Sequence, residues 1–185
     1  MAFSILPTAS LAASSVEEAL GEIDIYNGGK ELSYLMINGR VRTLIYTYYN
    51  YVNSKGETKE IPAYCVNPNI TGVPQTVAPG ESIEYIAEEK TSDPKVLGIV
   101  ANGYPTRTLA ELGLENKEQG YYATKIALWC YLLSNWDINN LKVNPNLTGV
   151  ELQRAQNMLA AAKDIYARGT AWTEVLSPGV TCTPD

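Results

Sequence analysis

Histidine is absent from the 185-residue sequence. This absence excludes Ser-His-Asp and Cys-His nucleophilic catalysis, imidazole acid-base chemistry and histidine-ligated metals. Any chemistry must therefore come from carboxylates, lysines, tyrosines or the three cysteines. Phenylalanine is almost as scarce, with 1 residue against 13 tyrosines. That imbalance suits an exported protein whose apolar surfaces also meet water, because a phenol keeps a polar end.

Basic charge is also in short supply. The chain has 14 Lys and Arg against 20 Asp and Glu, a formal net charge of -6, and no run of five basic residues. We therefore expect neither a nucleic acid partner nor attraction to anionic membranes. With 45% hydrophobic and 18% charged residues, the composition is that of one ordinary globular domain with enough apolar material for its own core.

The cysteines, Cys65, Cys130 and Cys182, are odd in number and show no CxxC spacing. Both features argue against a zinc site and against a disulfide-dense scaffold, so we expect no metal and no cofactor. Cys130 is either a small core residue or the disulfide partner of Cys182, and the distance between the two would decide.

The first fifteen residues carry no charge and end in a run of small residues that is typical of a signal-peptide cleavage site. We interpret residues 1–15 as the remnant of a signal peptide that lacks its positively charged start, the alternative being a floppy apolar N-terminus. No other stretch approaches the roughly 20 apolar residues that span a bilayer. The mature domain, residues 16–185, is expected to be exported and free of the membrane.

The first half of the mature domain predicts β structure. Segments rich in Ile, Val, Thr and Tyr alternate with strong turn signals at residues 27–29 and 38–39, and they predict antiparallel strands over residues 22–26, 31–38 and 41–52 and a return strand over 58–64. The tyrosines of residues 46–51 are interpreted as packing on both faces of a strand, with a recognition patch as the alternative.

Helical signals follow. Asp93 as N-cap before Pro94 predicts a helix over residues 94–102, and helical spacing of apolar residues predicts a second over 117–134. A third helix is expected to begin at Thr148, with a capping box to Glu151, and to end at residues 168–169.

Together these elements predict an α+β fold. An antiparallel β-barrel or sandwich, formed by about residues 22–92 and by a tail of residues 170–182 that returns to the sheet, would carry an inserted helical subdomain over residues 93–169.

Cys65 is the best candidate for a reactive atom, because it follows Tyr64 at a strand-to-loop junction; the alternative is a buried, inert cysteine. The Tyr64-Cys65 pair, Val73-Pro74 and the stretches 99–105 (IVANGYP) and 123–129 (ATKIALW) together resemble the thioester domains of Gram-positive surface adhesins and pilus tips. The resemblance extends over roughly residues 22–180.

In that family, a cysteine in an aromatic-Cys context is joined to the glutamine of a Thr-Gln-x-Ala-x-Trp helix motif by an internal thioester. The thioester acylates an amine on a host surface protein, with the thiolate as leaving group. The resemblance implies that Cys65 is the thioester cysteine and that Thr124, Ala127 and Trp129 match the helix motif. Trp129 would be a core residue, a wall of the bond, or both.

Lys125 stands in the glutamine position of that motif, and this departure bears on the covalent reaction. A lysine side chain has no acyl carbon, so Cys65 and Lys125 cannot form a thioester. Gln119, six residues earlier, is the alternative donor, but it would point to another face of the helix. Four outcomes remain open for Lys125: non-covalent binding in a degenerate site, a selected or engineered Gln→Lys change that places an amine permanently there, an oxidative bridge to Cys65, or snorkelling to solvent.

We therefore expect a monomeric adhesin module within a longer, wall-attached surface protein of a Gram-positive bacterium. Its partner would be an amine-bearing surface protein of a host or neighbouring cell, and it would be no enzyme. The alternatives are a structural spacer or pilin-like module, and a hydrolase that works through carboxylates, for which the sequence holds no motif.

Overall fold

The computed structural model describes residues 22–66, 73, 76–86, 91 and 93–173. In chain order its elements are β1 (Glu22–Ile37), β2 (Arg40–Val52), β3 (Thr58–Pro62), β4 (Ser82–Ile86), α1 (Pro94–Ala101), α2 (Leu109–Leu112), α3 (Lys117–Leu132), the 3-10 helix η1 (Ile138–Asn140), β5 (Lys142–Val143) and α4 (Gly149–Thr170). The predicted α+β class is confirmed.

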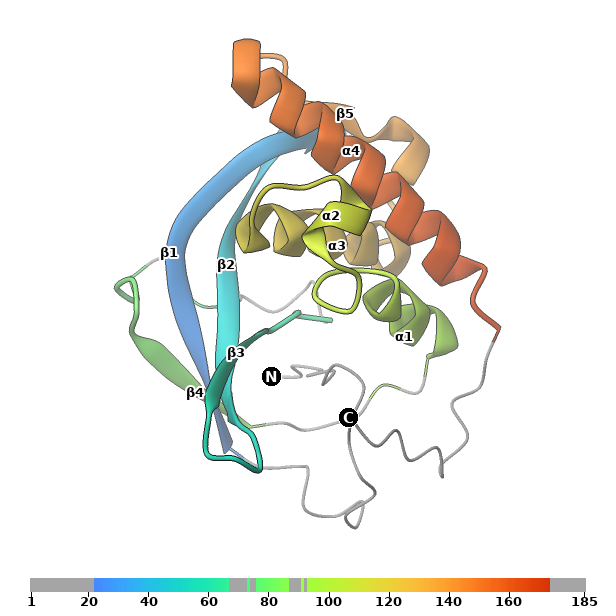
Figure 1. Cartoon of the computed structure of the whole chain (residues 1–185). Coiled ribbons are helices and arrows are strands. Elements are labelled where there is room, and N and C mark those ends of the chain that lie inside the picture. The colour runs from blue at the N-terminus through green and yellow to red at the C-terminus, as the bar shows by residue number, and fades with distance from the viewer. Residues whose placement is uncertain (1–21, 67–72, 74–75, 87–90, 92, 174–185) are drawn as a thin grey trace.

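All strand pairs in the described sheet are antiparallel, in the order β3-β2-β1-β4, and β5 pairs with the second half of β1. Figure 1 shows that β1 and β2 curve around the helical part, with α3 inside the curl and α4 across its upper end. Of the tail expected to return to the sheet, residues 170–182, Thr170 is the last residue of α4 and residues 171–173 form no strand, whereas residues 174–182 lie outside the described residues.

One predicted turn is wrong. The Asn27-Gly28-Gly29 signal does not reverse the chain, because β1 continues through it as one strand with a shift of register between Asn27 and Glu31. The buried Asn27 side chain donates to the Val77 carbonyl at 2.7 Å and accepts the Gly29 N–H at 2.7 Å. These bonds stabilise a bulge, and a bulge bends a strand where a turn would end it.

The helix predictions hold to within two residues at each end. Asp93 caps α1 as expected, accepting the N–H groups of Lys95 and Val96. The expected capping box at Thr148 is wrong, because the Thr148 side chain makes no cap hydrogen bond. Glu151 instead accepts hydrogen bonds from the Tyr34 hydroxyl and from Arg154, and so ties α4 to β1.

Helix α3 lies at the centre of the molecule. Every residue from Gln119 to Leu128 is buried, so the helix is enclosed on all sides and not along one stripe. The main core draws on β1, β2, α1, α3 and α4, and a smaller apolar cluster holds Ile25, Tyr49, Ala63, Cys65 and Tyr85. No helix among the described residues is long and apolar enough to cross a membrane.

Candidate ligand site on helix α3

Tyr121, Lys125 and Trp129 lie four residues apart and therefore share one face of α3. The Lys125 side chain is buried, with 7% of the residue exposed. Its Nζ donates to the Tyr121 hydroxyl at 2.8 Å and lies 5.1 Å from the Trp129 ring centroid. Lys125 thus stays between its two helix neighbours, and the alternative that it snorkels to solvent is wrong.

The two aromatic neighbours contact the ammonium group in different ways. Nζ is 5.2 Å from the Tyr121 centroid but 2.8 Å from the Tyr121 oxygen, so the hydroxyl makes the close contact. Trp129 makes no hydrogen bond to Nζ, and its ring supplies a π surface at cation–π distance. A hydroxyl oxygen and an indole ring together offset part of the cost of burying the ammonium group.

The hydrogen bonds around Tyr121 run in one direction. The Thr47 hydroxyl donates its single proton to the Ala63 carbonyl at 2.9 Å, so it must accept at its 2.7 Å contact with the Tyr121 hydroxyl. Tyr121 therefore donates to Thr47 and is left with an acceptor lone pair for Lys125. The chain from Lys125 through Tyr121 and Thr47 ends on the backbone two residues before Cys65.

Trp129 links this face of α3 to Cys65, because its indole Nε1 donates to the Cys65 carbonyl oxygen at 3.2 Å. The side chains of Tyr64 and Cys65 point to opposite sides of the chain, as successive residues in extended backbone do. Tyr64 enters the main core, whereas Cys65, 2% exposed, lies in the smaller cluster. Trp129 thus contacts both the Cys65 backbone and the Lys125 ammonium group.

The other residues of the predicted motif pack around the site or bind the backbone beside it. Tyr64 stacks on Tyr121 with ring centroids 5.1 Å apart, and its hydroxyl donates to the Tyr104 carbonyl at 2.5 Å. Burial raises the pKa of Tyr64 well above its usual value, which keeps the phenol neutral. Thr124 accepts the Tyr104 N–H at 2.9 Å and donates to the Gly120 carbonyl at 2.8 Å. Ala127 is fully buried.

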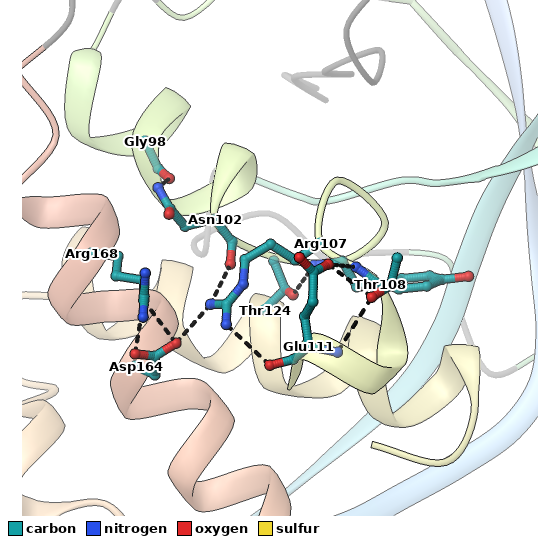
Figure 2. Close-up of polar contacts among 9 residues, drawn as sticks. Gly98, Asn102, Arg107, Thr108, Glu111, Thr124, Asp164 and Arg168 are labelled. Atoms are coloured by element: carbon teal, nitrogen blue, oxygen red, sulfur yellow. Dashed lines mark hydrogen bonds and ion pairs between the residues drawn. The ribbon is translucent and has the colours of Figure 1, made fainter. Parts of the chain in front are cut away.

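An arginine-centred network holds the loop between α1 and α2 (Figure 2). Arg107 pairs with Asp164 of α4 at 2.6 Å and donates to the carbonyls of Asn102 and Glu111. Burial works against ionisation of Asp164, but hydrogen bonds from Arg168 and Arg107 outweigh it and lower the pKa of this carboxyl. The network holds Tyr104 where Tyr64 and Thr124 bind its backbone.

None of the ion pairs between described residues includes Lys125. Within the same part of the chain, no group of three or more Cys, Asp and Glu residues is placed to hold a metal ion. Gln119, the alternative acyl donor, is buried at the start of α3, where its carboxamide oxygen accepts the Glu115 N–H at 3.0 Å. That glutamine closes the first turn of the helix.

Cys130 is the second buried cysteine of the described residues, and it is not in a disulfide with Cys65. Burial raises the pKa of its thiol to about 12. Cys130 lies in the main core, as the first predicted alternative requires. Its pairing with Cys182 stays a prediction, because Cys182 lies outside the described residues.

Comparison with known proteins gives this arrangement a family. Residues 62–171, more than half of the chain, match the thioester domain family, and the match contains the Tyr64-Cys65 pair and the whole of α3. The chain belongs to the thioester domain family. No curated protein sequence matches this thioester domain.

Two solved structures share its fold. The thioester domain of the Enterococcus faecium TIE86 protein has a TM-score of 0.57 and 18% identity, with 87% of this chain and 54% of that chain covered. The Bacillus anthracis TIE protein has a TM-score of 0.54 and 20% identity, with 86% of this chain and 25% of that chain covered. The chain therefore spans about half the length of the first and a quarter of the second.

Sequence reasoning found Lys125 and Trp129 but not Tyr121 or Thr47. Tyr121 could have been found, because it lies four residues before Lys125 on a predicted helix. Thr47 could not, because its contact with Tyr121 joins residues 74 positions apart and depends on how β2 faces α3.

Proposed function

We propose that this thioester domain is a surface adhesion module that recognises its protein partner without a Cys-Gln thioester. One observation carries the proposal: the residue that follows Thr124 and precedes the Ala127 and Trp129 of the motif is a buried lysine whose Nζ is bound to Tyr121. The position that would supply the acyl carbon in a covalent relative holds an amine here.

The chemistry of that replacement is decisive for the covalent step. A thioester forms when a thiol sulfur bonds to an acyl carbon and ammonia leaves a glutamine carboxamide. Lys125 has neither the acyl carbon nor the leaving group. Gln119 has both, but its carboxamide oxygen is committed to the Glu115 N–H. The proposal includes no oxidative bridge between the Cys65 sulfur and the Lys125 nitrogen, because Nζ is hydrogen-bonded to the Tyr121 hydroxyl.

Membership of the family supports the remaining parts of the proposal. The domain would be exported, would lie in a longer multidomain protein attached to a Gram-positive cell wall, and would bind a surface protein of a host or a neighbouring cell as a monomer. The two structural relatives come from Enterococcus faecium and Bacillus anthracis and extend well beyond the matched region. Such a module binds stoichiometrically and does not turn over a substrate.

The test compares the parent chain with Lys125→Gln and with the double variant Cys65→Ala, Lys125→Gln. Each is incubated with candidate surface proteins, and complexes are measured by surface plasmon resonance and then by denaturing electrophoresis. We expect the parent to bind reversibly, Lys125→Gln to form a complex that survives denaturation, and the double variant to lose that complex.

A denaturation-resistant complex with the parent chain would contradict the proposal. Failure of the parent and of Lys125→Gln to bind any of the candidates would contradict the adhesin role and is the result that a structural spacer predicts.

A further inference from the structure

We infer that the space between the Tyr121 hydroxyl and the Trp129 ring is a binding site for a primary alkylammonium group, and that Lys125 is its built-in occupant. The inference deepens the proposed function, because it concerns the same face of α3, and it rests on contacts that do not depend on adhesion.

The first supporting step is the orientation of the Tyr121 hydroxyl. Its proton is committed to Thr47, whose own proton is committed to the Ala63 carbonyl. The Tyr121 oxygen therefore presents an acceptor to the space in front of it and cannot at the same time present a donor there. Such a site favours an N–H or O–H donor and disfavours a carboxylate.

The second step is the choice of a cation over a neutral donor. The Trp129 ring faces the same space with its centroid 5.1 Å from Nζ, and an indole face attracts a positive charge. None of the described ion pairs involves Nζ, so the hydroxyl and the ring are what the described residues offer to the charge. An acceptor oxygen beside a π surface matches the ammonium end of an alkyl chain.

The third step is access. Trp129 is half-buried, and Lys125 fills the space between it and Tyr121 at 7% exposure. An external amine can enter only if the Lys125 side chain is absent or swings out. In the parent chain the site is therefore self-occupied, and the partner must be recognised through another surface.

The test removes the occupant and restores its head group from solution. Lys125→Ala is unfolded in urea with n-butylammonium, methylammonium or n-butanol at matched ionic strength. We expect saturable stabilisation by n-butylammonium, with a dissociation constant on the order of 1–10 mM. At ten times that constant, the folding equilibrium constant should rise about tenfold. Methylammonium, with less alkyl chain, and butanol, without the charge that the Trp129 ring attracts, should both act more weakly.

Two matched controls accompany that titration. Lys125→Met keeps the volume of the side chain without its charge, and the parent keeps the occupant, so neither should respond to n-butylammonium. No saturable stabilisation of folded Lys125→Ala, an equal effect of butanol, or an equal response of Lys125→Met would overturn the inference. None of these outcomes depends on partner binding, so they are distinct from failure of the proposed function.

A second measurement covers the case in which Lys125→Ala does not fold. A double-mutant cycle combines Lys125→Met with Tyr121→Phe, two substitutions that nearly conserve volume. Lys125→Met should raise the unfolding equilibrium constant by a certain factor in the parent chain. We expect that factor to be about tenfold smaller when Lys125→Met is made in the Tyr121→Phe background. Additive effects would mean that Tyr121 does not recognise the ammonium group, and they would overturn the inference.

Discussion

At the scale of single residues, the molecule is organised around a buried ammonium group that is not in any described ion pair. Burying a charge is costly unless polar groups replace water, and here one hydroxyl and one indole ring do so around Lys125. The centre of the site is therefore an ammonium group flanked by aromatic side chains. The proposed function depends on Lys125.

Tyr64 gives a residue-scale prediction about the frame of the site. Tyr64→Phe removes the hydroxyl that donates to the Tyr104 carbonyl at 2.5 Å and leaves that carbonyl short of a donor. We expect a loss of about 1–2 kcal/mol in the free energy of unfolding, measured by urea denaturation. Tyr51→Phe, at a position that is 47% exposed, is the matched control and should change it by less than about 0.5 kcal/mol. Equal effects of the two would argue against a tight loop contact.

At the scale of elements, local signals failed where a long-range contact competes with them. Asn27-Gly28-Gly29 reads as a hairpin turn, but Asn27 binds the Val77 carbonyl fifty residues away and the strand continues. Thr148 and Glu151 have the spacing of a capping box, but Tyr34 of β1 takes the Glu151 carboxylate. The capping box that does form, Thr108 with Glu111, lies on the four-residue α2, which is too short for helical periodicity to reveal.

The crossing of α1 and α4 gives an element-scale prediction. A Cβ atom on Gly169 would lie 2.4 Å from the Ile99 Cα and 2.5 Å from the Ile99 backbone nitrogen, and backbone cannot move aside as a side chain can. Gly169→Ala should therefore cost about 1–3 kcal/mol of stability, despite the better helix propensity of alanine.

The control for this crossing is Gln156→Ala, at an exposed position of the same helix, which should be neutral or slightly stabilising. Thermal and urea unfolding of both variants measure the difference. A stabilised Gly169→Ala would show that the two helices lie farther apart than described.

At the scale of the whole molecule, the fold class and most of the site could be predicted from the sequence. Strand composition, turn residues and helix caps predicted a sheet followed by helices, and the motif around Cys65 and Lys125 predicted the family. The contact of α3 with β2 could not be predicted from the sequence. That contact pairs Tyr121 with Thr47, and it depends on the curl of the sheet and not on any local pattern.

Because the chain lacks histidine, the pH dependence of its stability should be set by carboxyl groups on the acid side and by thiol and phenol groups on the alkaline side. Hydrogen bonds from Tyr34 and Arg154 lower the pKa of Glu151, and those from Arg168 and Arg107 lower that of Asp164 against the effect of burial. A lowered folded-state pKa gives stability that is present above the unfolded pKa, about 4, and is lost as the pH falls through the folded value. The urea midpoint should therefore fall below about pH 4.5.

On the alkaline side, burial raises the pKa of the Cys130 thiol to about 12. A raised folded-state pKa gives stability that is lost as the pH rises from the unfolded value, about 8.5 for a thiol. The midpoint should thus stay flat from about pH 5.5 to 8 and decline above about 8.5, and Cys130→Ala should delay that decline to about pH 10. A transition between pH 6 and 7 would contradict this account, because no side chain of ordinary pKa titrates there.

We propose that this thioester domain carries no thioester, and the intact mass of the protein tests this proposal most directly. Thioester formation from glutamine releases ammonia, so a thioester lowers the mass by about 17 Da, and a small amine such as methylamine then adds to the acyl carbon. We predict that the denatured parent chain shows no deficit and takes up no methylamine, whereas Lys125→Gln shows both effects. A deficit of about 17 Da with a methylamine adduct in the parent chain would contradict the account.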